Sequence, residues 1–139
     1  MEAAEARALF ATARVARLAT VTSDGRPHVV PVCFSTDGDR IYTAVDHKPK
    51  RTTNLRRLEN VAASPNVSVL ADRYTDDWSS LWWVRADGLA RVAAVGEPEH
   101  DTAIARLAER YPQYVENPPA GPAIIVTVSR WSGWRASAD

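Results

Sequence analysis

The stretch RLATVTSDGRPHVVPVCFSTDGDRIYTAV, residues 17–45, decides the fold. Two Asp-Gly pairs divide it, and this dipeptide tolerates the positive φ that a tight hairpin turn requires. The three apolar segments around these turns, residues 17–22, 27–35 and 40–45, therefore predict a meander of three antiparallel strands.

The middle strand of this meander is apolar at nearly every position from Val29 to Phe34. Such a pattern predicts that both of its faces are covered. Pro31 lies inside it and has no N–H group to give to a neighbouring strand. The strand is therefore expected at a sheet edge or at a bulge.

The rest of the chain adds helices and further strands around the meander. Helical spacing of apolar residues and strand-like alternation predict the order α-β-β-β-α-β-β-α-β, with helices over 2–14, 53–63 and from Pro98 onward, and further strands over 66–74, 81–95 and 123–131. Asp87-Gly88 interrupts the strand over 81–95, which is either a hairpin or one strand bent at a glycine bulge. Strands come in antiparallel neighbours, so we expect a mainly β domain over 1–139, a small antiparallel barrel with peripheral helices.

Composition limits the function. The chain has 17 Lys and Arg against 17 Asp and Glu, so no protein-wide attraction to nucleic acid or to an anionic membrane is expected. Cys33 is the single cysteine, which excludes an intrachain disulfide and a thiol metal cluster, and the three histidines lack metal-ligand spacing. No apolar run is long enough for a membrane span, and the N-terminus does not resemble a signal peptide. We therefore expect a cytoplasmic protein.

Positive charge is concentrated in DHKPKRTTNLRRL, residues 46–58, with five basic residues and one acid. Lys48, Lys50 and Arg51 are predicted in a loop just before a helix, whose N-terminus attracts anions. Arg56 and Arg57 would oppose the helix dipole there, at a cost of about 0.3–1 kcal/mol each. The pattern fits a phosphate or carboxylate site, but a solvated basic helix start would look the same. A nucleic-acid patch is disfavoured because stacking aromatics are not interleaved with the basic residues.

Three strings in order resemble one known family: RLATVTSDGRPHVVPVCF, IYTAVDHKPKRTTNLRRLENVAASPNVSVLAD and DWSSLWWVRADGLARV. They are similar to the split barrels of the pyridoxamine 5'-phosphate oxidase type, and more narrowly to the short, single-domain coenzyme F420-dependent oxidoreductases. The resemblance covers nearly the whole chain. It implies a six-stranded antiparallel split β-barrel that forms a homodimer, with a flavin or deazaflavin in a groove between the subunits.

The resemblance also implies roles for individual residues. Lys48, Lys50 and Arg51 would bind the cofactor's phosphate, with Asn54 as a further donor. Positions on the second and third strands, on the long strand and in the loop just before it would lie beside the ring: Pro31, Val32, Cys33, Phe34, Tyr42, Thr43, Ala44, Trp78 and Trp83.

The chain departs from the oxidase branch in two places. That branch has a glutamine before the Val-Arg pair of the long strand, where this sequence has Trp83 in WWVRADG. It also has a longer C-terminal region with basic residues for pyridoxal phosphate. These departures argue against pyridoxamine phosphate oxidation and are compatible with a deazaflavin. The narrower resemblance implies hydride transfer between F420 and a small conjugated substrate. An FMN-dependent reductase or oxidase is the alternative, as is a protein that binds flavin, deazaflavin or haem without turnover. No acid–base residue is identified, and Cys33 is interpreted as an inert core thiol.

Overall fold

The computed structural model describes residues 1–45 and 51–137, with side chains from Arg56 onward in the helix that begins at Arg51. Its strands are β1 (Ala16–Val21), β2 (Pro27–Val32), β3 (Ser35–Asp37), β4 (Arg40–Ala44), β5 (Asn66–Arg73), β6 (Trp82–Ala93) and β7 (Ala123–Arg135). Its helices are α1 (Ala3–Thr12), α2 (Arg51–Ala63), the 3₁₀ turn η1 (Trp78–Ser80), α3 (Pro98–Arg110) and α4 (Gln113–Glu116).

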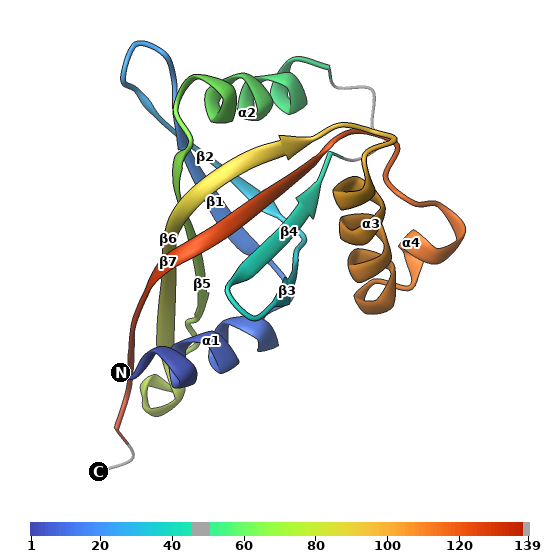
Figure 1. Cartoon of the computed structure of the whole chain (residues 1–139). Helices are drawn as coiled ribbons and strands as arrows, with labels where there is room; N and C mark the ends of the chain where they lie inside the picture. Colours follow the sequence, from blue (N-terminus) through green and yellow to red (C-terminus); the bar gives the residue numbers. More distant parts are fainter. Residues whose placement is uncertain (46–50, 138–139) are drawn as a thin grey trace.

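The described strands form one antiparallel sheet in the order β2-β1-β5-β6-β7-β4-β3. β2 and β3 follow each other directly in the chain but stand at opposite ends of that order. The sheet therefore curls into a half-barrel, with helices at its periphery (Figure 1). The mainly β fold with peripheral helices is confirmed.

The number of strands differs from the prediction, because the sheet has seven strands and not six. The predicted strand over 27–35 ends at Val32, and a new strand begins at Ser35. The reason is a change of partner: β2 pairs with β1, whereas β3 pairs with β4. Cys33 and Phe34 carry the chain from one edge of the sheet to the other.

The end of α3 closes this crossing point. The Tyr111 hydroxyl accepts a hydrogen bond from the Phe34 N–H at 3.1 Å and lies 2.9 Å from the carbonyl oxygens of Phe34 and Arg14. Arg110 donates to the Phe34 carbonyl at 2.9 Å, and its guanidinium lies 4.6 Å from the centre of the Phe34 ring. Arg110 also donates to the carbonyl of Ala13, just past the end of α1. These contacts satisfy backbone groups that no strand pairs.

The β2 edge of the sheet has few N–H groups free to pair with another strand. Thr22 N–H donates to the Arg26 carbonyl at the hairpin turn, so in this register the even-numbered residues of β2 exchange hydrogen bonds with β1. The backbone groups of Pro27, Val29 and Pro31 then face outward, and only Val29 has an N–H to give. The prediction that Pro31 marks an edge strand is confirmed.

β6 is one long bent strand, so the bulge interpretation of Asp87-Gly88 is confirmed and the hairpin interpretation is wrong. Its pairing with β7 shifts between Asp87 and Gly88, where Ser129 has no residue opposite it. A Cβ atom at Gly88 would lie 2.2 Å from the carbonyl oxygen of Thr127. The close approach of the two backbones therefore requires glycine at this position.

The main core fills the inside of the curled sheet. Phe10 of α1 lies there beside Phe34, with ring centroids 4.8 Å apart. A second, smaller cluster lies on the other side of the sheet, where Ala103 of α3 packs on Tyr42 and Ile125. Helix α3 thus covers the outer face of β4 and β7, while the outer face of β2, β1, β5 and β6 remains open to solvent.

Candidate functional site

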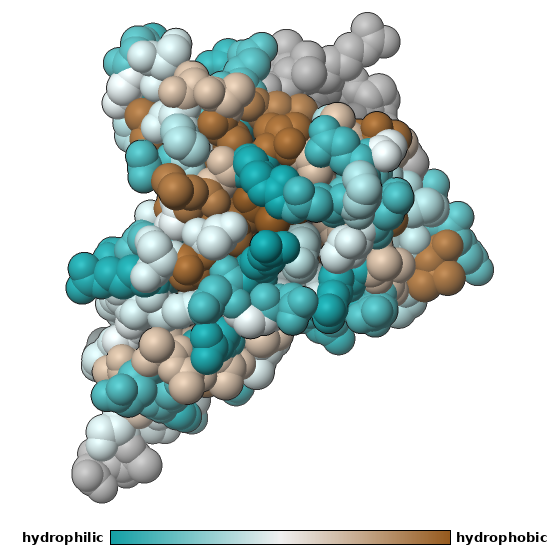
Figure 2. All heavy atoms as spheres, viewed as in Figure 1, coloured by the Kyte–Doolittle hydropathy of each residue, from teal (hydrophilic) through white to brown (hydrophobic). Residues whose placement is uncertain are grey.

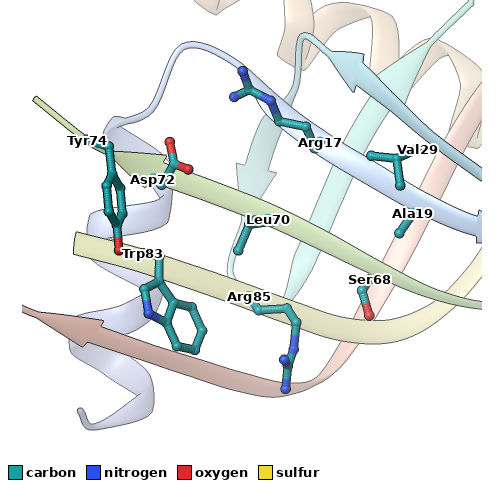
Figure 3. A pocket seen from close by; sticks show the side chains of 9 residues that line it. All are labelled: Arg17, Ala19, Val29, Ser68, Leu70, Asp72, Tyr74, Trp83 and Arg85. Atoms are coloured by element: carbon teal, nitrogen blue, oxygen red, sulfur yellow. The ribbon is translucent and has the colours of Figure 1, made fainter. Parts of the chain in front are cut away.

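A hollow of about 550 Å³ lies on this open outer face. Strand alternation points one set of side chains outward from neighbouring strands. The lining residues are Arg17, Ala19, Val29, Ser68, Leu70, Asp72, Tyr74, Trp83 and Arg85 (Figure 3). We call this hollow the face pocket.

The floor of the face pocket is apolar. Val29 is 59% exposed and Leu70 is 37% exposed, and Ala19 and the partly buried Trp83 lie with them. A contiguous apolar surface bordered by charge is typical of a ligand or protein contact. The face seen in Figure 2 also bears apolar surface between α2 and β6, with hydrophilic residues around it.

Charged side chains border the apolar floor. Arg85 donates from Nε to Asp87 at 3.2 Å, and Asp87 also accepts from the Ser68 hydroxyl at 2.6 Å, so Arg85 is held in place. Arg17 stands at the other side of Leu70 (Figure 3). Two guanidinium groups beside an apolar floor suit a flat ligand that carries negative charge.

The two tryptophans of the resemblance have different positions. Trp83 lines the face pocket. Trp78 begins the 3₁₀ turn that joins β5 to β6 and is 76% exposed, but it is not a lining residue of this pocket.

The positions predicted beside the ring on the second and third strands lie apart from the face pocket. The side chains of Val32, Phe34, Tyr42 and Thr43 are buried in the protein. Pro31 is exposed, whereas Cys33 and Ala44 are partly buried. The Thr43 hydroxyl donates to the Cys33 carbonyl at 2.8 Å, so the two strands do meet, at the crossing point of the chain. Their role as ring contacts stays a prediction.

A second hollow, of about 390 Å³, opens at that crossing point. Cys33, Arg14, Arg110 and Tyr111 are among its lining residues. Burial raises the pKa of the Tyr111 hydroxyl. The interpretation of Cys33 as a core thiol agrees only in part with the structure, because Cys33 is partly buried.

The structure describes only part of the basic segment 46–58. Lys48 and Lys50 lie outside the described residues, and so do the side chains of Arg51 and Asn54. Arg51 was predicted in the loop but is the first residue of α2, so Arg56 and Arg57 lie in the second turn and not in the first. Arg56 is exposed, while Arg57 is partly buried, and that burial lowers the pKa of its guanidinium. The assignment of the loop to a phosphate stays a prediction.

A polar hollow of about 600 Å³ separates α2 from the β1–β2 turn. It combines both signs of charge, with Arg26 and Arg56 against Asp24 and Glu59, and includes His28. Hydrogen bonds from Thr22 and Arg26 lower the pKa of the Asp24 carboxyl. Because its positive and negative side chains balance, this hollow does not indicate a particular class of ligand.

Among residues 1–45 and 51–137, no three His, Cys, Asp or Glu side chains gather as metal ligands. No helix in the described part of the chain has the length and apolar character needed to cross a membrane.

Sequence reasoning missed several residues of the face pocket: Arg17, Ala19, Val29, Ser68, Leu70, Asp72, Tyr74 and Arg85. The available signal was the alternation in β1 and β5, where apolar Leu70 falls on the same face as charged Arg17 and Asp72. The longer apolar runs of the meander form the core instead.

A curled antiparallel sheet, open at β2 and β3 and with an uncovered apolar face, defines a split-barrel domain. A sequence model of the pyridoxamine 5'-phosphate oxidase family matches residues 3–135, and the chain belongs to that family. No curated protein matches the sequence.

Solved structures agree with the split-barrel fold. A conserved hypothetical protein from Mycobacterium tuberculosis has a TM-score of 0.71 at 24% identity, over 97% of this chain and 85% of that one. An FAD-binding protein from Mesorhizobium loti has a TM-score of 0.71 at 22% identity, over 96% and 94% of the two chains. A haem-binding protein from Mycobacterium smegmatis has a TM-score of 0.75 at 21% identity, and this chain covers 56% of its length.

Proposed function

We propose that the protein is an oxidoreductase that binds a flavin-type cofactor at the face pocket, with coenzyme F420 as the first candidate. One observation carries the proposal: in a member of the pyridoxamine 5'-phosphate oxidase family, an apolar floor lies open between Arg17 and Arg85. The substrate would be a small conjugated molecule that stacks on the exposed side of the ring.

The lining residues fit such a cofactor. Leu70 and Ala19 offer an apolar surface to a planar ring, and Trp83 adds an aromatic wall. Arg17 and Arg85 offer forked donors to anionic groups of the cofactor. Bound there, a deazaflavin or flavin supplies hydride transfer, and the protein orients it and excludes water from one of its faces.

The phosphate would lie at the start of α2. Lys48, Lys50 and Arg51 are the proposed contacts, with Asn54 as a further donor, as the family resemblance implies. The N-terminus of a thirteen-residue helix favours an anion at this place. A homodimer with the cofactor between its subunits is part of the same proposal.

F420 is favoured over FMN because of Trp83. This residue lines the face pocket at the place where the oxidase branch has a glutamine. An indole cannot reproduce the hydrogen bonds of that amide to a flavin ring. The change therefore fits a cofactor with different ring chemistry.

A flavin or haem protein without turnover is the second candidate. Two similar structures support binding of such a group: an FAD-binding protein from Mesorhizobium loti and a haem-binding protein from Mycobacterium smegmatis. Free access of a substrate to the bound ring would favour an enzyme, whereas a sealed ring would favour a carrier.

Titration of the purified protein with F420, FMN and haemin, followed by tryptophan fluorescence, tests this proposal. We expect tight F420 binding with weaker FMN binding, and a weaker F420 complex when Lys50 and Arg51 are both changed to alanine. Preference for FMN would favour the FMN-dependent reductase or oxidase of the same fold, and preference for haemin would favour the second candidate. Binding of none of the three would refute the cofactor assignment.

A further inference from the structure

The ion pair of Arg85 and Asp87 lies on the outer face of β6, at the β-bulge. Arg85 donates from Nε to Oδ2 of Asp87 at 3.2 Å. Oδ1 of Asp87 accepts a hydrogen bond at 2.6 Å from the hydroxyl of Ser68, which stands directly opposite on β5. Both carboxylate oxygens are therefore engaged, and the Asp87 side chain is held between two strands.

The bulge also fixes the backbone of Asp87. Its carbonyl accepts a hydrogen bond at 3.1 Å from the hydroxyl of Ser129, the residue of β7 that has no partner opposite it. Gly88 lets the two strands approach closely at the same place. Bulges are frequent next to binding sites, where they set the direction of a side chain.

The bond through Nε leaves the far end of the Arg85 side chain available to a ligand. Its two terminal NH2 groups form no hydrogen bond with any residue in the described part of the chain. They offer two parallel donors, which match a carboxylate or two neighbouring acceptor atoms at the edge of a ring. Arg85 stands beside Leu70, so the fork borders the apolar floor of the face pocket (Figure 3).

The second arginine of the pocket has no such support. Arg17 stands opposite Leu70 on the β1 side, and its side chain forms no ion pair with the side chains that the structure describes. Arg17 thus supplies positive charge, whereas Arg85 supplies charge in a fixed direction.

Folding stability does not explain the pair of Arg85 and Asp87. Their side chains are 45% and 31% exposed, and an ion pair in such contact with water contributes little to stability. Water and salt also weaken the repulsion between Asp87 and a bound anion. The remaining effect of the pair is orientation, because an arginine held in place loses less side-chain entropy when a ligand binds.

We infer that Asp87 and Ser68 are positioning residues, which hold the Arg85 guanidinium for a flat ligand with an acceptor edge. The floor takes the flat body of this ligand, and Arg85 binds a carboxylate or two neighbouring ring acceptors at its edge. That the ligand is the cofactor rests on the proposed function, whereas the class of acceptor stands on the geometry of Arg85.

Titration with 2-naphthoate tests the class of acceptor without a cofactor. This probe joins a flat apolar body to one carboxylate, and 2-naphthamide has the same shape without the charge. NMR signals of the Trp83 indole N–H should show naphthoate binding that Arg85→Ala weakens about tenfold or more, with little effect on naphthamide. Arg85→Lys keeps the charge but not the fork, and it should bind naphthoate nearly as weakly as Arg85→Ala. Naphthoate that binds no better than naphthamide, or a lysine that replaces the arginine without loss, would overturn the inference.

A double-mutant cycle tests whether Asp87 acts through Arg85. Asp87→Ala should weaken naphthoate binding about three- to tenfold when Arg85 is present, but less than about twofold in the Arg85→Ala protein. A gain in affinity would show that Asp87 competes with the ligand for the guanidinium, and equal losses in both proteins would show an independent effect. Either result would overturn the positioning role. Asp87→Asn keeps the size of the side chain without its charge, and it replaces Asp87→Ala in the cycle if that variant does not fold.

The β1–β2 turn provides a matched control. Asp24 accepts there from Nε of Arg26 at 3.1 Å and from the hydroxyl of Thr22, with the same two-residue separation between the charged partners. Asp24 does not line the face pocket, so Asp24→Ala should leave the affinity for naphthoate unchanged. A loss as large as that of Asp87→Ala would indicate a general effect on the fold and contradict the inference.

The same cycle with F420 and FMN separates the inference from the proposed function. A cofactor that shows the coupling between Asp87 and Arg85 has an acceptor group at this fork, which supports both. If the original protein binds neither cofactor while naphthoate shows the coupling, the proposed function fails and the inference holds.

Discussion

The Tyr111 hydroxyl lies 3.1 Å from the backbone nitrogen and 2.9 Å from the backbone oxygen of Phe34, which is 77 residues earlier in the chain. The Tyr111 side chain, at the end of α3, thus makes the hydrogen bonds to Phe34 that a neighbouring strand would make in a continuous sheet. It does so where the chain passes from β2 to β3. Phe34 lies between β2 and β3 and has no partner in the strand pairing of either.

Tyr111→Phe should therefore destabilise the fold. The Phe34 N–H would lose its partner in a buried place, which costs about 1–3 kcal/mol. Urea denaturation measures the loss as a lower free energy of unfolding. Tyr74→Phe, at a position 61% exposed, is the control and should stay within about 0.5 kcal/mol. An equal effect of both changes would contradict the role of Tyr111 at the crossing point.

The same hydroxyl should make stability depend on alkaline pH. Burial raises the pKa of Tyr111 above its ordinary value of 10.0, so the folded state favours the protonated form. Its contribution is complete below pH 10 and is lost as the pH rises from there through the raised pKa. The difference in unfolding free energy between the original protein and Tyr111→Phe should shrink over this range. A difference that stays constant from pH 9 upward would refute the linkage.

The face pocket gives a prediction for cofactor affinity. Arg17→Ala and Arg85→Ala should each weaken binding of F420, or of FMN if that is the ligand, by about tenfold or more, since a charge-assisted hydrogen bond contributes about 1.5–3 kcal/mol. Isothermal titration calorimetry gives the affinity. Arg40→Ala changes an exposed arginine on β4 and should leave it unaltered. Equal affinities for all three variants would show that the cofactor does not bind at the face pocket.

Gly88→Ala tests the bent ribbon of β6 and β7. The new Cβ would meet the Thr127 carbonyl oxygen at 2.2 Å, and because that atom belongs to the backbone the strands themselves must move apart. We expect a loss of about 1–3 kcal/mol, typical of overpacking, seen as a lower melting temperature. Leu89→Ala, at the exposed neighbouring position, should change stability by no more than about 0.5 kcal/mol. A Gly88→Ala protein as stable as the original would show that the bulge adapts.

The sequence predicted most elements because their signals are local. Asp-Gly turns separate the first strands, and helical spacing marks α3. The break at Cys33 and Phe34 has no such signal, since the apolar run continues through it. It exists because β2 and β3 find partners at opposite ends of the sheet, and because Tyr111, far along the chain, satisfies the backbone between them.

The candidate site was less predictable for a similar reason. Trp83 was identified through the family resemblance, and it does line the face pocket. Arg17, Leu70 and Arg85 come from three strands that are neighbours only in the folded sheet. Strand alternation tells which face each residue shares, but the order β1-β5-β6 that unites them depends on pairing over long separations in the chain.

The two prolines of β2 have a consequence beyond the single molecule. Fibrils grow when the free edge of one sheet accepts a strand from the next molecule, and each added strand needs a row of N–H donors. Pro27 and Pro31 leave that row with Val29 alone, and the other edge strand, β3, spans only three residues. The sheet thus has an open apolar face but no edge that favours polymerisation of one molecule onto the next.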